Sequence, residues 1–402
     1  MKNAPAKSAA SNPAHYKTSK IKLCFFWCFL VIISLVAMEL LSFTVLKLTT
    51  RKGTYQDGVV QVKNPFHPYL GYVHAPNITF KISKGMSRKT GISTDENGYS
   101  ITPAYSHANP DITIIVTGGS TIFGVGSSDN STTVPSALER LINERLDIRA
   151  EVVNLALRGG QSFQEMLLVD RFLAENQADL VLAISGRNDA SNAISDPTVE
   201  GAFLKRHVWE NAVHLVNRVE REEFMIVNLS SKFRSWSYTY DLLYHCLNGL
   251  FKSKKSRSSA EWSTLNLRRE AFTTLKKRAK ITATHYAATD QISKMNGANF
   301  VMILQPTLYY KNIWTEFELH RINRQHGSEN LIEKYRQNEH EFYDAFRKIE
   351  KPFQFIDLSN IFSEYNETLY IDQCHYNDLG AEKLAEKVLD SIQPLLHEIR
   401  DR

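Results

Sequence analysis

The chain has 402 residues, of which 43% are hydrophobic and 23% are charged, values typical of a soluble globular protein. This length allows one large domain or two ordinary ones. The net charge is only +5, which argues against a nucleic-acid partner, because a dedicated nucleic-acid-binding protein carries a strongly basic surface.

The N-terminal region contains one long apolar run. Residues 1–22 are polar and rich in Ala, Ser and Lys, and we expect a disordered cytoplasmic tail there. Residues 23–46 carry a single charge, Glu39, and as a helix would extend about 36 Å, enough to cross a bilayer. Lysines and arginines flank the run on both sides and favour a cytoplasmic N-terminus only slightly.

A cleaved signal peptide is the alternative to a membrane anchor. The apolar run is long for a signal peptide, and no small-residue cleavage site follows it. We therefore expect a retained transmembrane helix over 23–46. Glu39 would reach the membrane interface or pair with a partner helix.

The segment that follows is expected to connect the membrane to the main domain. Residues 47–109 are rich in Gly, Pro, Asn, Tyr and His, with short alternating stretches that indicate an extended, partly β segment. Among the cysteines, Cys24 and Cys28 lie in the apolar run, whereas Cys246 and Cys374 lie outside it. Whether the last two pair is left open, and no CxxC metal signature occurs.

From Asp111 onward, short apolar runs alternate with segments of helical periodicity. This alternation predicts an α/β domain over 110–400 with a mostly parallel sheet covered on both faces. The expected strands are Ile112–Thr117, Ala150–Leu155, Leu180–Ser185, Asn299–Leu304 and Phe353–Asp357. The expected helices are Val134–Leu146, Ser162–Glu175, one that includes Glu339–Ile349, and Leu379–Leu396.

A long stretch without strand signals interrupts this pattern. Residues of about 190–297 contain the basic run Lys252–Arg257 and clusters of aromatic residues, and we expect a mainly helical insertion. A lid or substrate wall, a contact with the membrane surface, and a solvated elaboration without a specific role all remain open.

Four polar blocks occur where expected strands end or where the last helix begins. Because the carboxyl ends of parallel strands share one edge of a sheet, we expect these blocks to converge there. Glycines after the first strand permit a tight turn that would expose Ser120 as a nucleophile. The blocks are Gly118–Thr121 (GGST), Asn154–Ser162 (NLALRGGQS), Gly186–Asp189 (GRND) and Asp372–His375 (DQCH).

This set of blocks resembles the SGNH/GDSL hydrolase superfamily over Asp111–Leu396, apart from the insertion. It is similar to the membrane-anchored bacterial members whose first block reads GGST, as are the phrases HPYLGY (His67–Tyr72) and TDENGY (Thr94–Tyr99). The resemblance implies a flavodoxin-like three-layer αβα sandwich, here preceded by one transmembrane helix. The commoner first block of the family has Asp at the position of Gly119, which weakens any transfer of lipase-type specificity.

The resemblance also implies roles for individual residues. Ser120 would be the nucleophile, His375 the general base and Asp372 the residue that orients His375. The backbone N–H groups of Ser120 and Gly159 and the side-chain amide of Asn188 would form the oxyanion hole. Neither a metal nor an organic cofactor is implied.

Several neighbouring residues carry separate expectations. Gly160 is the alternative to Gly159 in the oxyanion hole. Arg187 is expected at the rim of the site, where it could favour an anionic substrate. Asp189 and Asn154 are expected to hold loops, Asp378 to cap the last helix, and Cys374 to be a buried spacer or a redox-sensitive thiol.

The function expected from these observations is that of a membrane-anchored serine esterase. It would hydrolyse acyl esters, with acetyl as the expected group, on an envelope carbohydrate or a lipid-linked substrate. The expected location is the inner membrane of a cell, with the catalytic domain on the periplasmic side. An O-acyltransferase with the same site and a non-catalytic scaffold are the alternatives, and the sequence does not indicate an oligomeric state.

Overall fold

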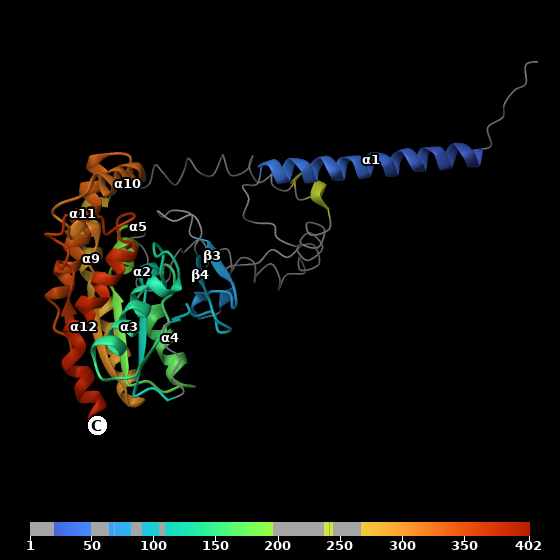
Figure 1. Cartoon of the computed structure of the whole chain (residues 1–402). Helices are drawn as coiled ribbons and strands as arrows, with labels where there is room; N and C mark the ends of the chain where they lie inside the picture. The colour runs from blue at the N-terminus through green and yellow to red at the C-terminus, as the bar shows by residue number, and fades with distance from the viewer. Residues whose placement is uncertain are drawn as a thin grey trace, which may run out of the picture. The chain divides into compact units, whose positions relative to one another are not determined.

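The computed structural model describes residues 20–49, 64–67, 69–81, 91–103, 109–195, 237–240, 242–243 and 267–402 (Figure 1). The predicted tail before residue 20, most of the predicted insertion and Cys246 lie outside these residues. The chain divides into two compact units. One contains α1 (Lys20–Thr49) and residues 237–243, and the other contains the sheet described below.

Helix α1 includes the predicted membrane span. Its segment Lys22–Val45 has a mean hydropathy of 2.5, and its side chains are largely exposed within the protein. By length and composition this is a helix that could cross a membrane.

A parallel sheet of five strands forms the centre of the second unit, in the order β6-β5-β7-β8-β9. Within this sheet, the chain first forms β5, then β6 on one side of β5, and then β7 on the other side of β5. This is the flavodoxin-like strand order expected from the sequence, and the α/β fold class is confirmed. The strands are β5 (Ile112–Gly118), β6 (Ala150–Asn154), β7 (Leu180–Ser185), β8 (Asn299–Leu304) and β9 (Gln354–Asp357).

Helices cover both faces of this sheet. Side chains point alternately to the two faces along each strand, so both faces carry apolar side chains that pack against helices. Ile114 and Val116 of β5 belong to the core cluster that contains residues of α3 and α12, whereas Ile115 belongs to the cluster that contains residues of α4, α9 and α11. The helices are α2 (Ser120–Phe123), α3 (Val134–Arg145), α4 (Ser162–Leu173), α5 (Arg187–Ser195), α9 (Leu267–Met295), α10 (Glu316–His326), α11 (Glu329–Arg347) and α12 (Asp378–Arg400) (Figure 1).

The element boundaries differ from the sequence predictions in a few places. Strands β7 and β8 have the predicted bounds, and the other strands differ by one residue at an end. Helix α11 begins ten residues before the segment that the sequence indicated, and α10 was not predicted. Thr315 begins α10 with a capping box that pairs it with Glu318. The apolar periodicity that predicts a helix is weak in this segment, because only Glu318 and Ile322 of α10 are buried. The capping box is therefore the main sequence signal for α10.

The described residues of 64–67, 69–81 and 91–103 include two short antiparallel pairs that pack against the sheet domain. The pairs are β1 (Phe66–His67) with β2 (Gly71–Tyr72) and β3 (Thr79–Lys81) with β4 (Gly91–Ser93). Phe80 and Ile92 are part of the main core cluster. The side chain of Asn130, at the start of a 3₁₀ turn, joins β4 to this domain by bonds to both backbone groups of Ser93. Residues of this segment thus contribute to the domain core.

Two leucines of the sheet domain should differ strongly in how much they contribute to the free energy of unfolding. Leu182 of β7 is fully buried, whereas Leu379 of α12 is 44% exposed. We expect Leu182→Ala to lower the free energy of unfolding by about 2–5 kcal/mol, because it leaves a cavity in the core. The matched Leu379→Ala should change it by less than about 0.5 kcal/mol. Urea unfolding of the full-length protein in detergent, followed by tryptophan fluorescence, measures both, and equal midpoints would contradict this description of the core.

Candidate active site

Ser120 lies where β5 ends, at the first position of the short helix α2. Gly119 precedes it in extended conformation, and Ser120 itself does not have a positive φ angle. Its backbone N–H belongs to the first turn of α2, where helices leave donors without an internal acceptor. Among the described residues, this N–H has no hydrogen-bond acceptor. Ser120 therefore presents a hydroxyl and a free N–H at the same edge of the sheet.

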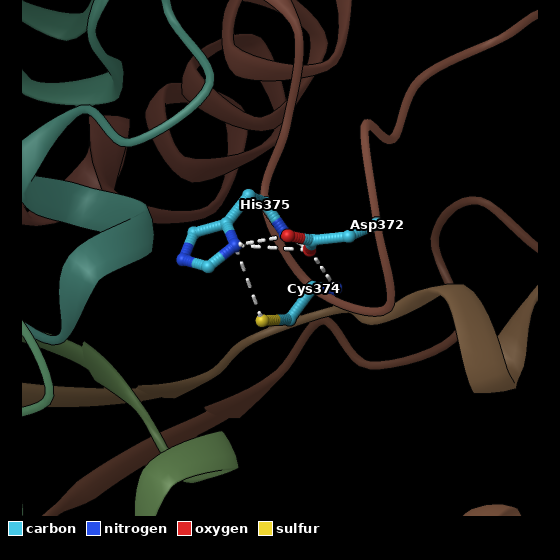
Figure 2. Close-up of side chains that lie close together, drawn as sticks. All are labelled: Asp372, Cys374 and His375. Atoms are coloured by element: carbon cyan, nitrogen blue, oxygen red, sulfur yellow. Dashed lines mark hydrogen bonds and ion pairs between the residues drawn. The ribbon is translucent and has the colours of Figure 1, made fainter. Parts of the chain in front are cut away.

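His375 brings the imidazole to this serine from the loop before α12. The Oγ atom of Ser120 lies 2.7 Å from Nε2 of His375. On the other side of the ring, Nδ1 lies 2.8 Å from Oδ2 of Asp372 (Figure 2). A carboxylate at Nδ1 favours the tautomer with the proton on that nitrogen, which leaves Nε2 free to accept the proton of the serine hydroxyl. Ser120, His375 and Asp372 thus form one continuous hydrogen-bonded chain.

The Asp372 carboxylate is held in place by its own loop. Its Oδ1 atom accepts the backbone N–H groups of Cys374 at 3.1 Å and His375 at 3.0 Å. Burial raises the pKa of Asp372, but the charge of His375 and these hydrogen bonds more than offset it, so that the pKa is well below its ordinary value. Asp372 is therefore a carboxylate throughout the range in which a histidine titrates.

The imidazole of His375 responds to two opposite effects. Burial lowers its pKa, whereas negative charge on Cys374 and Asp372 raises it, and the net direction is upward from the ordinary value of 6.5. Because Asp372 is charged at neutral pH, we expect it to account for the upward direction there. The side chains of His375 and Asp372 are 16% and 17% exposed, so this pair is reached from solvent at one edge.

The second block forms a tight turn beside Ser120. Gly159 has a φ of +76°, in the left-handed region that favours glycine. The N–H of Gly160 closes the turn by donating to the carbonyl of Leu157 at 2.7 Å, whereas the N–H of Gly159 has no acceptor among the described residues. The N–H of Leu157 donates in turn to the carbonyl of Gly118, which joins this turn to the end of β5. Of the two glycines, Gly159 is the one with a donor available for a ligand.

Asn188 supplies a third donor from the start of α5. Its Nδ2 atom donates to the carbonyl of Gly160 at 2.7 Å, which leaves its second amide hydrogen available. The same atom lies close to Gly119: a Cβ atom at residue 119 would come within 2.3 Å of it. The glycine at this position therefore makes room for the amide of Asn188 next to Ser120.

A buried polar network holds the turn and α5 together. Asp189, 2% exposed, accepts the backbone N–H and the hydroxyl of Ser162 at 3.0 and 2.8 Å, and the hydroxyl of Thr282 at 3.0 Å. One turn away on α9, Arg278 donates to Oε1 of Gln161 at 2.7 Å. These contacts agree with the expectation that Asp189 holds a loop, and they show that α9 supports the turn containing Gly159.

The opposite side of the same turn contacts the N-terminal β segment. The hydroxyl of Tyr72 donates to the carbonyl of Arg158 at 2.5 Å, and the N–H of Arg158 donates to Nε2 of His74 at 3.2 Å. Burial, assisted by the charge of Arg158, lowers the pKa of His74 to about 3, so its ring is neutral and can accept this bond. Sequence reasoning missed these supporting residues, although Tyr72 lies in the phrase HPYLGY.

Two expectations for single residues are wrong. Arg187 is not at a rim: it is 5% exposed, and its Nε lies 2.9 Å from the fully buried carboxylate of Glu339. A guanidinium this deeply buried needs a paired carboxylate, and the required partner lies far away in the sequence. Asp378 does not cap α12: Asn377 does, by accepting the N–H of Gly380 at 2.8 Å, whereas Asp378 accepts the N–H of Ser128. Asn154 holds the loop as expected, by donating to the carbonyl of Ile122.

Helix α10 supports the loop that carries Asp372. The Oε1 atom of Glu318 accepts the N–H groups of Leu369 and Tyr370, and Nε of Arg321 donates to the carbonyl of Ile371. Glu318 is itself paired with the fully buried Lys311 at 2.6 Å. Only the capping box at the start of α10 could have indicated this support from the sequence.

Cys374 is a free, buried cysteine whose Sγ lies 3.8 Å from Nδ1 of His375 (Figure 2). The ligand atoms of Asp372, Cys374 and His375 lie within 4.8 Å of one another, a spacing that a metal ion could use. An ion bound through Nδ1 of His375 would displace the hydrogen bond between that nitrogen and Asp372.

Comparisons with known proteins give structural likeness without close sequence identity. No family model and no curated protein matches the chain. An acetyl xylan esterase shares 13% identity and a TM-score of 0.35, over 70% of this chain and all of that one. An acetylxylan esterase from Geobacillus stearothermophilus shares 12% identity and a TM-score of 0.36, over 70% of this chain and 94% of that one.

A lipase/acylhydrolase from Enterococcus faecalis shares 13% identity and a TM-score of 0.34, over 70% of this chain and 96% of that one. Superposition at this level assigns neither a family nor an activity to the chain. The site geometry described above is therefore the basis for its function.

The titration of His375 can be predicted. We expect its pKa to lie above 6.5, and Asp372→Asn to lower it, because the substitution removes the negative charge at Nδ1. Heteronuclear NMR of histidine-labelled protein measures both, with the signal assigned by its loss in His375→Gln. Cys374→Ala is the matched control and should shift the pKa less, because a thiol carries no charge until it ionises. A wild-type pKa at or below 6.5 would contradict the prediction.

Proposed function

We propose that the chain is a membrane-anchored serine esterase of the SGNH type. The observation that carries the proposal is the hydrogen-bonded chain from Ser120 through His375 to Asp372. It lies at the edge of the sheet where the N–H groups of Ser120 and Gly159 have no acceptor in the part of the chain that the structure describes. A serine hydroxyl is a weak nucleophile unless an adjacent base takes its proton, and this arrangement supplies such a base. Fold alone would not support an activity, because one fold hosts many.

In the proposed reaction, the Oγ atom of Ser120 attacks the carbonyl carbon of an ester while Nε2 of His375 accepts the hydroxyl proton. Asp372 stabilises the imidazolium that forms. The imidazolium then donates its proton to the departing alkoxide, which leaves an acyl group on Ser120. Water, deprotonated by the same imidazole, releases the acid and restores the serine.

The negative charge of the tetrahedral intermediate would be met by three donors. The N–H of Ser120, the N–H of Gly159 and the second amide hydrogen of Asn188 come from three separate segments that the contacts above bring together. Each such donor accounts for about 2.7–4 kcal/mol of transition-state stabilisation in a comparable enzyme. We assign the oxyanion hole to Gly159 and not to Gly160, because the N–H of Gly160 already donates to the carbonyl of Leu157 to close the turn.

We further propose that the substrate is an acyl ester, with acetyl as the group, on an envelope carbohydrate or a lipid-linked molecule. Support comes from α1, which is long and apolar enough to anchor the protein, and from the partly exposed polar site. The proposed location is the inner membrane with the site on the periplasmic side.

Replacing Ser120 tests the activity directly. With full-length protein in detergent, we expect Ser120→Ala to reduce p-nitrophenyl acetate hydrolysis by at least about a thousandfold and to abolish labelling by a fluorophosphonate, because both need the nucleophile. His375→Ala should have the same effect. Ser131→Ala, at an exposed serine close in sequence, is the matched control and should leave both signals unchanged.

The pattern of outcomes separates the alternatives. Labelling without turnover would indicate acyl transfer to an acceptor other than water, which labelled acyl donor and candidate glycans would then reveal. Neither labelling nor turnover in a folded protein would reject the esterase and favour a scaffold.

Replacing Gly119 tests the oxyanion hole. Gly119→Ala places a Cβ atom within 2.3 Å of the Asn188 amide and should displace it, which lowers the rate of ester hydrolysis by about 100- to 1000-fold. Asn188→Ala should have a similar effect. Because both act on the same amide, the double variant should be no slower than Asn188→Ala alone. Additive losses would show that Gly119 acts in some other way.

A further inference from the structure

Glu39 is a charged residue inside the apolar helix α1, and its carboxylate is hydrogen-bonded by a distant part of the chain. Oε1 accepts the backbone N–H of Tyr238 at 2.8 Å, and Oε2 accepts the backbone N–H of Thr239 at 2.8 Å. The hydroxyls of Thr239 and Ser237 also donate to Oε2. Four donors from residues 237–239 therefore surround one carboxylate, and no basic side chain is among them.

Two more contacts extend this interface along the same face of α1. Ser42, 4% exposed, donates to the hydroxyl of Thr239 at 3.2 Å, and the rings of Phe43 and Tyr238 meet edge to face with centroids 4.9 Å apart. Glu39, Ser42 and Phe43 have the spacing of residues that share one face of a helix. Figure 1 shows the short yellow segment beside α1.

The position of Glu39 sets the depth of this contact. The apolar span ends at Val45, six residues later, so Glu39 lies about 9 Å inside the span along the helix axis. An ionisable group at such a depth is costly unless polar partners accompany it. The segment that supplies those partners also exposes apolar side chains, because Tyr238, Tyr240 and Leu243 are 41%, 37% and 57% exposed.

We propose that residues 237–240, 242 and 243 enter the membrane beside the C-terminal part of the span, with Glu39 as the fixed contact and lipid around Tyr240 and Leu243. The backbone N–H groups of Tyr238 and Thr239 would otherwise lack acceptors in lipid, and here the carboxylate of Glu39 accepts both. Tyrosine suits this depth, since it is enriched where a membrane meets water. The proposal rests on the apolar helix and is independent of the esterase site.

Cross-linking tests the contact. Full-length protein in phosphatidylcholine nanodiscs, with its native cysteines replaced by alanine, would carry Ser42→Cys with Thr239→Cys. We expect a disulfide after mild oxidation, because the two hydroxyls now lie 3.2 Å apart. The control pair, Ser34→Cys with Thr239→Cys, lies about 12 Å further along α1 and should cross-link at least about tenfold less. If the Ser42–Thr239 pair cross-links no more than the Ser34–Thr239 pair, or if neither pair cross-links, the proposed contact is wrong.

Fluorescence quenching tests the depth. A bimane label on Tyr240→Cys should be quenched by lipids that carry nitroxides on their acyl chains. The same label on Glu398→Cys, at the exposed end of α12, should not be quenched. If the label on residue 240 is quenched no more than the label on residue 398, residue 240 lies outside the membrane and the proposal fails.

Replacing Glu39 tests its part in the contact. Glu39→Leu removes every acceptor and should lower cross-linking of the Ser42–Thr239 cysteine pair by about tenfold or more. Glu39→Gln keeps one acceptor oxygen and should lower it less. An unchanged unfolding midpoint shows that the sheet domain is intact. Undiminished cross-linking in Glu39→Leu would show that Glu39 is not the fixed contact.

Discussion

Strand β5 pairs with β6 on one side and with β7 on the other, so the chain leaves all three strands at one edge of the sheet. Because β6 and β7 lie on opposite sides of β5, the loops after β5, β6 and β7 meet without crossing. Ser120, the turn with Gly159, and Asn188 follow these strands in that order. The site depends on this pairing, since each of its donors lies within five residues of the end of one of these strands.

Parallel pairing brings the loops together, but buried hydrogen bonds set their geometry. Asp189 fixes α5 to the start of α4 through Ser162, and it reaches α9 through Thr282. Tyr72 and His74 hold the same turn from the other side. A buried polar network of this kind is valuable only when its members are satisfied, because an unpaired member in a low-dielectric interior is costly. The geometry of the turn is therefore set by residues other than Ser120, His375, Asp372 and the proposed oxyanion donors.

The sequence predicted the sheet well, because continuous apolar runs such as Leu180–Ser185 leave little choice of structure. It also predicted that Ser120 and Asn188 meet at one edge, since the carboxyl ends of parallel strands share that edge, and that His375 joins them from the segment before the last helix. It did not predict the partners of those residues. The pairing of Arg187 with Glu339 and the support that α10 gives to the loop before Asp372 join segments far apart in the chain. Hydropathy periodicity reports which face of an element is buried, and it does not report which polar group will meet another.

The two side-chain hydrogen bonds of His375, to Asp372 and to Ser120, differ greatly in the sequence separation of the residues that they join. Asp372 is three residues from His375 and can meet it within one loop, whereas Ser120 is 255 residues away. During synthesis, the serine would leave the ribosome long before the histidine. The loop of His375 is then held by α12, whose residues share a core cluster with α3 and β5. The site can therefore assemble only once α12 has been translated, and a chain that stops short of α12 would hold its serine without a stable base.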